Sequence, residues 1–153
     1  MNSLNQQKDT NPKKKSKMSQ WCDKIIGTND GDFRGVTIGQ DFEAIRKIEK
    51  MKLLDEGEDF MTFSCTNDDF ELIDISYFGK NQKLDSIKVN VYLNHQADSE
   101  LLLNEMKTQF TEKFGIPVIE GDGLYWHHDR LHTVSLKNRS HTLDNGIVIT
   151  IES

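Results

Sequence analysis

The sequence predicts an α+β fold: two helix-then-three-strand units forming one antiparallel sheet, with the helices on one face. Two segments carry apolar residues at helical spacing, and each is followed by three runs in which apolar and polar residues alternate. Short connections rich in turn residues join most of these runs, which favours antiparallel hairpins. A chain of 153 residues with 35% hydrophobic residues favours a single core.

Residues 1–20 are expected to form a disordered basic tail, and residues 21–153 a single folded domain. Asn, Gln, Lys and Ser dominate the tail, and no hydrophobic periodicity is present. The stretch "KKKSK" at 13–17 is compatible with a nuclear localisation signal, with a nucleic-acid contact and with a solvated tail. We expect the solvated tail, because five residues are a short basic signal.

The first helix is expected to begin within "IGQDFEAI" at residues 38–45. Gly39 allows a turn, and Asp41 is a suitable N-cap because its side chain can accept a hydrogen bond from the free amides of the first turn. The stretch "LLDEGED" after the helix is predicted to be a loop around Gly57. The side chains that should face the core are Phe42, Ile45 and Ile48.

Three strands are predicted after this loop, at residues 60–66, 70–79 and 83–93. The connections "NDD" and "KNQ" between them are short, which is typical of hairpins. The expected inward-facing side chains are Met61, Phe63 and Cys65, then Ile73, Ile75 and Tyr77, then Ile87, Val89, Val91 and Leu93.

The second helix is predicted over residues 98–114, and Gly115 followed by Pro117 ends it. Three more strands are predicted at 123–128, 132–138 and 146–152. The apolar stripe of the helix consists of Leu102, Leu103, Met106 and Phe110.

The entry "IGQDFEAI" is similar to the glycine-then-capped-helix entry of the beta-lactamase-inhibitor-protein-like superfamily, which includes small lipoproteins of the outer-membrane assembly machinery. Gly39 matches the family glycine, Asp41 stands where Ser or Thr is favoured, and Ile45 matches an apolar position, whereas Ala44 replaces a polar residue. The helix-then-three-strands repeat over residues 35–152 also resembles that family. The resemblance implies a non-enzymatic protein that binds other proteins through a sheet surface. It transfers no binding residues, and its members are exported.

The stretch "LYWHHDRLH" at 124–132 is predicted to be a hairpin with a three-residue loop. This register pairs Leu124 with Leu136 and Trp126 with Val134, which puts the apolar side chains on one face. His128 and His132 then become cross-strand neighbours at the rim. Two imidazoles could share a metal ion, but a zinc site needs three or four ligands. We therefore expect neither a metal site nor a cofactor.

No catalytic motif is evident in the sequence. It contains no G-x-S-x-G element and no phosphate-binding glycine loop. Cys22 and Cys65 form no CxxC pair, and Cys65 is expected to be a buried, inert thiol because it falls on the apolar face of its strand. We therefore expect a non-catalytic protein. The alternative is a ligand-binding or enzymatic domain that uses the sheet face near Tyr125, Trp126 and His127.

A run of acidic residues between positions 53 and 79 contains no Lys or Arg. Solvated loops would explain such a run, but a field of one sign also steers and selects a partner of opposite charge. The carboxylates flank one strand of about seven residues, which predicts a stripe along an edge with ends roughly 20 Å apart. The candidate partner-binding residues are Asp55, Glu56, Glu58, Asp59, Asp68, Asp69, Glu71 and Asp74.

Charge and hydropathy limit the classes of partner and the locations that we expect for the protein. Residues 1–20 hold five lysines and one aspartate, so with a total charge of −6 the remaining residues carry −10. An acidic body repels phosphate backbones, which makes nucleic acid a poor partner. No apolar run approaches the roughly 20 residues of a membrane helix, and no signal-peptide h-region is visible. We expect a small, acidic, cytoplasmic, inhibitor- or immunity-like module that binds a basic partner protein, with no membrane association.

Overall fold

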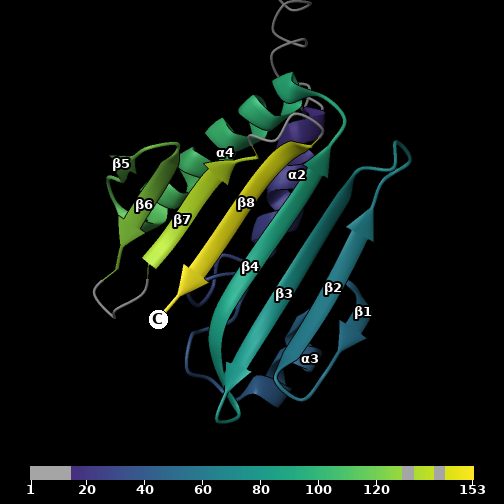
Figure 1. Cartoon of the computed structure of the whole chain (residues 1–153), viewed down its shortest axis with the longest axis vertical. Helices are drawn as coiled ribbons and strands as arrows, with labels where there is room; N and C mark the ends of the chain where they lie inside the picture. The colour runs from purple at the N-terminus through teal and green to yellow at the C-terminus, as the bar shows by residue number, and fades with distance from the viewer. Residues whose placement is uncertain (1–14, 129–132, 140–143) are drawn as a thin grey trace, which may run out of the picture.

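The structure is a computed structural model that describes residues 15–128, 133–139 and 144–153. Its described residues form an eight-stranded antiparallel sheet in the order β1-β2-β3-β4-β8-β7-β6-β5 (Figure 1). The strands are β1 (Lys52–Glu56), β2 (Phe60–Thr66), β3 (Leu72–Lys80), β4 (Lys83–Leu93), β5 (Val118–Glu120), β6 (Gly123–His127), β7 (Thr133–Asn138) and β8 (Asn145–Glu152). The helices are α2 (Lys17–Ile26), η1 (Phe42–Ala44), α3 (Ile45–Ile48) and α4 (Gln96–Phe114).

The core lies between the sheet and the helices. Helix α4 packs on β4, β8, β7 and β6, and α2 packs on α4. Figure 1 shows the helices behind the sheet, and no described helix covers its other face, which we call the open face. Alternation decides which side chains enter the core, as in β8, where Ile147, Ile149 and Ile151 are buried and Val148 and Thr150 are not. The α+β class with an antiparallel sheet is therefore confirmed.

The two-unit arrangement of one helix and three strands is not confirmed, because the sheet is larger. Strands β1 and β5 each add a fourth strand at an edge of the sheet. Every residue of both strands is exposed. Neither strand therefore shows the alternation of buried and exposed residues that reveals a strand in a sequence.

The predicted tail boundary at residue 20 is wrong for residues 17–20, which form the first part of α2. The Ser16 side chain caps the helix by accepting a hydrogen bond from the amide of Ser19 at 3.2 Å. Residues 1–14 lie outside the described residues. The helix is held by a buried stripe at helical spacing, which consists of Met18, Trp21, Cys22 and Ile25.

The helix predicted after Asp41 is shorter than expected. Only a 3₁₀ turn (η1) and one turn of α-helix (α3) form, and the Asp41 side chain makes no capping hydrogen bond. The reason is that this segment is tied to the β3–β4 hairpin: the amide of Phe42 donates to the carbonyl of Gln82 at 2.9 Å. Phe42 and Ile45 are nevertheless buried, as the sequence predicts.

The predicted register of the β6–β7 hairpin is confirmed. Leu124 is paired with Leu136 and Trp126 with Val134. The predicted pair His128 and His132 cannot be described, because residues 129–132 lie outside the described residues. Among the described helices, none is long and apolar enough to cross a membrane.

Candidate functional site

The predicted acidic residues do not form one continuous surface. Asp74 lies on the outer face of β3, between Ser64 of β2 and Asn90 of β4 in the register. The others are divided between the two ends of β2. Asp55, Glu56, Glu58 and Asp59 lie before its first residue, and Asp68, Asp69 and Glu71 follow its last.

Glu71 is part of the structure of its turn, because its side chain is fully buried. Its Oε1 lies 2.7 Å from Lys17 Nζ and accepts a hydrogen bond from Asn67 Nδ2 at 2.9 Å. Its Oε2 accepts one from the amide of Asn94 at 3.0 Å. Burial alone raises the pKa of Glu71, but these bonds, above all the one from Lys17, bring it below its usual range. Glu71 therefore binds α2 to the turn and does not face solvent.

Two of the acidic residues before β2, Glu58 and Asp59, line a cavity of about 320 Å³ together with residues that the sequence does not group with them. Phe42 lines the cavity, and its ring lies against Gly79, where a Cβ atom would lie 3.0 Å from that ring. A backbone bond from Gly79 to the carbonyl of Asp59 at 2.8 Å fixes the wall. The cavity is lined by Asp41, Phe42, Glu43, Glu58, Asp59, Gly79 and Gln82.

The charge of this acidic cavity is only partly balanced. Arg46 lies beside it: Nε donates to Glu43 at 3.0 Å, and a second nitrogen pairs with Glu56. Three carboxylates, those of Asp41, Glu58 and Asp59, have no cationic partner among the described residues. No group of three or more His, Cys, Asp or Glu side chains in the described ranges is placed to hold a metal ion. The carboxylates of Asp41, Glu58 and Asp59 are suited to bind an ammonium or guanidinium group.

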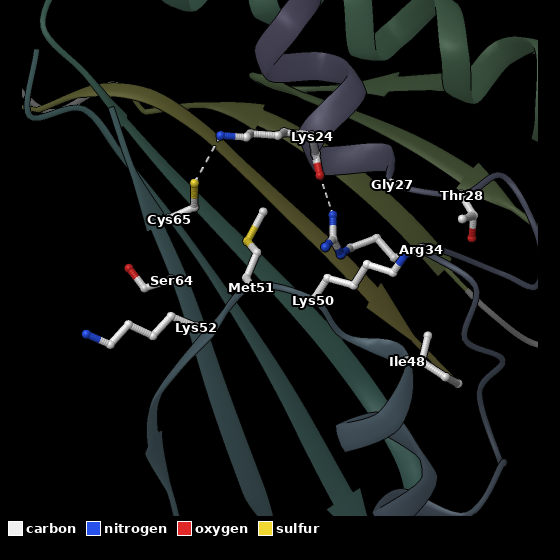
Figure 2. Close-up of a pocket in the computed structure, with 10 residues that line it drawn as sticks. All are labelled: Lys24, Gly27, Thr28, Arg34, Ile48, Lys50, Met51, Lys52, Ser64 and Cys65. Atoms are coloured by element: carbon white, nitrogen blue, oxygen red, sulfur yellow. Dashed lines mark hydrogen bonds between the residues drawn. The ribbon is translucent and has the colours of Figure 1, made fainter. Parts of the chain in front are cut away.

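A second, larger cavity of about 620 Å³ opens between the end of α2, the end of α3 and the first two strands (Figure 2). Among the described residues, its lining contains four basic side chains and no carboxylate. We call it the basic cavity. Its lining residues are Lys24, Gly27, Thr28, Arg34, Ile48, Lys50, Met51, Lys52, Ser64 and Cys65.

One wall of the basic cavity is a buried polar network. Arg34 Nε and Nη2 donate to the two oxygens of Glu49 at 2.9 and 2.8 Å. The Tyr77 hydroxyl donates to Glu49 Oε1 at 2.6 Å. Burial lowers the pKa of Arg34, but the Glu49 carboxylate outweighs it and the net shift is upward. Because Glu49 neutralises Arg34, the guanidinium is a fixed part of the wall.

Cys65 also lines the basic cavity, so the prediction of a buried thiol is wrong. The side chain points to the helix face, as the alternation predicts, but it is only half-buried. In Figure 1, α3 lies beside the start of β2 and α2 lies behind β4 and β8, so neither helix lies behind the end of β2, to which Cys65 belongs. Lys24 Nζ reaches across from α2 and lies 3.3 Å from the sulfur (Figure 2).

The alternative site near Tyr125, Trp126 and His127 is divided between two faces. Trp126 is buried and donates from Nε1 to the carbonyl of Gly115 at 2.9 Å, so it cannot face a ligand. Tyr125 lies on the open face, where Lys137 sits 5.5 Å from its ring. His127 is exposed, and the ring of His128 packs edge-on against Phe114 at 5.6 Å.

Comparison of the chain with protein-family models, curated proteins and solved structures finds no match. The likeness of residues 38–45 to the beta-lactamase-inhibitor-protein-like superfamily stays a prediction. The two oppositely charged cavities are therefore the features of the protein that indicate a function.

Proposed function

We propose that the protein is a small acidic, non-catalytic binding module of the inhibitor or immunity type, and that its acidic cavity accepts a Lys or Arg side chain of a basic partner protein. Support for this proposal comes from the carboxylates of Asp41, Glu58 and Asp59, which line one cavity without a cation of their own among the described residues. A charged side chain of the partner would supply the missing counter-charge.

The shape and position of the cavity fit this role. Asp41 and Glu43 come from the segment before α3, while Glu58 and Asp59 come from the β1–β2 turn, so carboxylates approach from two sides. The backbone bond between Gly79 and Asp59 and the bond between Phe42 and Gln82 hold both segments before a partner arrives. Binding then causes little loss of conformational entropy in these segments, which favours affinity. A guanidinium group can also contact a carboxylate through two parallel hydrogen bonds.

The test compares three forms of the immobilised protein in capture from an extract of the native organism at low salt. The cavity variant carries Asp41→Asn, Glu58→Gln and Asp59→Asn. The control variant carries Glu100→Gln, Glu112→Gln and Asp122→Asn, three exposed residues outside the cavity, and therefore has the same net charge.

We expect the wild type and the control variant to retain the same basic protein, and the cavity variant to retain at least about tenfold less of it. Equal retention by all three forms would show that any binding depends on something other than the cavity. Equal loss from both variants would show that overall charge, and not the cavity, governs binding.

A further inference from the structure

The basic cavity is an exception in an acidic protein. The whole chain carries a net charge of −6, yet the described residues that line this cavity include Lys24, Arg34, Lys50 and Lys52 and no Asp or Glu. The volume of the basic cavity, about 620 Å³, lies inside the range of roughly 300–1,000 Å³ that is usual for small-molecule sites. A basic partner of the acidic cavity would be repelled here, so any occupant of this cavity would differ from that partner in charge.

Within the part of the chain that the structure describes, the lysines of the basic cavity form no ion pairs. Lys24, Lys50 and Lys52 are exposed at residue level and have no carboxylate partner among the described residues. They come from three places in the chain: the last turn of α2, the loop after α3 and the first residue of β1. In Figure 2, Lys24 crosses toward Cys65, Lys50 extends to the Arg34 side and Lys52 extends past Ser64. Positive charge therefore borders the cavity on more than one side.

Apolar side chains line the space between these lysines. Met51 lies between Cys65 and Arg34 in Figure 2, and Ile48 lies on the side near Arg34 and Thr28. Both are half-buried and pack against the main core. An inorganic anion would use the lysines and leave this apolar surface wet, whereas a neutral apolar molecule would leave the lysines without a partner.

We propose that the basic cavity binds a small amphipathic anion, with a carboxylate or phosphate headgroup at the lysines and a short apolar body against Met51 and Ile48. The Arg34–Glu49 pair stays intact and serves as a rigid wall. This site is separate from the acidic cavity and does not depend on the proposed partner protein.

Cys65 provides a direct reporter of occupancy. The chain has two cysteines; Cys22 is 2% exposed, whereas Cys65 is half-buried and lines the basic cavity. An uncharged disulfide reagent such as dithiodipyridine should therefore label Cys65 in the folded protein and leave Cys22 unlabelled. A ligand in the cavity will cover the Cys65 sulfur and slow that reaction.

The experiment measures the labelling rate in the presence of sodium decanoate, decyl phosphate, decyltrimethylammonium or inorganic phosphate, each below any micelle-forming concentration. We expect decanoate, decyl phosphate or both to slow labelling saturably, by at least about fivefold, and the other two to have little effect. Comparison of the two anionic amphiphiles identifies the preferred headgroup. Equal protection by the cationic amphiphile would overturn the proposal, as would protection by inorganic phosphate alone or by none of the four.

Charge-matched variants test the role of the lysines. In the cavity variant Lys24, Lys50 and Lys52 are changed to Gln; in the control, Lys80, Lys83 and Lys107, which are exposed and outside the cavity, are changed to Gln. Calorimetric titration with the protective amphiphile should show binding weakened at least about tenfold in the cavity variant and unchanged in the control. Equal affinity in both variants would overturn the proposed role of the lysines. A single Met51→Gln variant tests the apolar contact separately and should bind the amphiphile more weakly than the wild type does.

Discussion

Arg34 and Glu49 form a buried bidentate ion pair that connects three parts of the fold. The guanidinium also donates from Nη1 to the carbonyl of Ile25 at 2.8 Å, near the end of α2. Glu49 Oε2 accepts from the amide of Met51 at 2.9 Å, and Oε1 accepts from the Tyr77 hydroxyl of β3. One ion pair thus fixes the end of α2, the chain leading to β1 and the sheet behind the basic cavity.

Replacing Glu49 with Gln should destabilise the protein strongly. The substitution leaves the Arg34 charge buried without a counter-charge, and breaking a buried pair in this way typically costs about 3–5 kcal/mol. Urea unfolding at neutral pH measures the loss. The matched control is Glu43→Gln, which removes a carboxylate from the exposed Arg46 pair and should change the midpoint little. Similar midpoints for both variants would contradict the importance assigned to the buried pair.

The contribution of Glu49 should also depend on pH. Burial raises the pKa of Glu49, but hydrogen bonds from Arg34 and Tyr77 and the Arg34 charge outweigh it, so the net pKa lies below its ordinary value of 4.5. The stabilisation is therefore fully present above about pH 4.5 and is lost as the pH falls through the lower pKa of the folded state. The difference in unfolding free energy between wild type and Glu49→Gln should shrink between pH 6 and pH 3. A constant difference over that range would contradict this assignment.

Tyr77 should not ionise in the folded protein. Burial, together with the neighbouring Glu49 carboxylate, raises the pKa of its hydroxyl far above the ordinary value. In an ultraviolet titration, Tyr77→Phe should therefore develop the same phenolate absorbance as wild type until the alkaline unfolding transition. The same variant should lose about 1–2 kcal/mol of stability, because Glu49 loses one hydrogen bond. A lower phenolate amplitude in the folded variant would show that Tyr77 titrates.

The sequence predicts the strands that have one buried face and misses those that have none. The predicted range of 83–93 is the observed range of β4, because its alternating apolar side chains all enter the core. In β1 no side chain is buried, so its amino-acid sequence resembles that of a loop. Helix α2 did leave a signal, a stripe from Met18 to Ile25, but it crosses the boundary assigned to the tail.

The two cavities were harder to predict because each one is assembled from distant segments. The sequence indicates Glu58 and Asp59 as candidates, whereas Asp41 and Glu43 join them only through the pairing of their segment with the β3–β4 hairpin. No local pattern in the sequence indicates the basic cavity. Its basic residues lie between positions 24 and 52, and only the gap between α2 and α3 brings them beside Cys65.

Gly146 should be essential for joining the two halves of the sheet, which meet where β4 pairs with β8. Its φ is 138°, and a Cβ atom there would lie 1.7 Å from the carbonyl oxygen of Val91. Gly146→Ala should therefore lower the unfolding free energy by at least about 2 kcal/mol. Gly39→Ala is the matched control: its φ of 92° is also positive, but nothing lies within 4 Å of the added Cβ. Equal losses in the two variants would show that backbone conformation alone explains the effect.

Association of the captured basic partner should depend on salt through the acidic cavity. Raising ionic strength from about 0.01 to 0.1 M shortens the Debye length from about 30 to 10 Å, which screens attraction between exposed charges before contact. The association rate of the wild type should therefore fall steeply with salt, while the dissociation rate changes less. The Asp41→Asn, Glu58→Gln, Asp59→Asn variant should show a lower rate and a shallower salt dependence in stopped-flow measurements. The Glu100→Gln, Glu112→Gln, Asp122→Asn control removes the same charge elsewhere, so identical slopes for the two variants would mean that the partner responds to total charge and not to the acidic cavity.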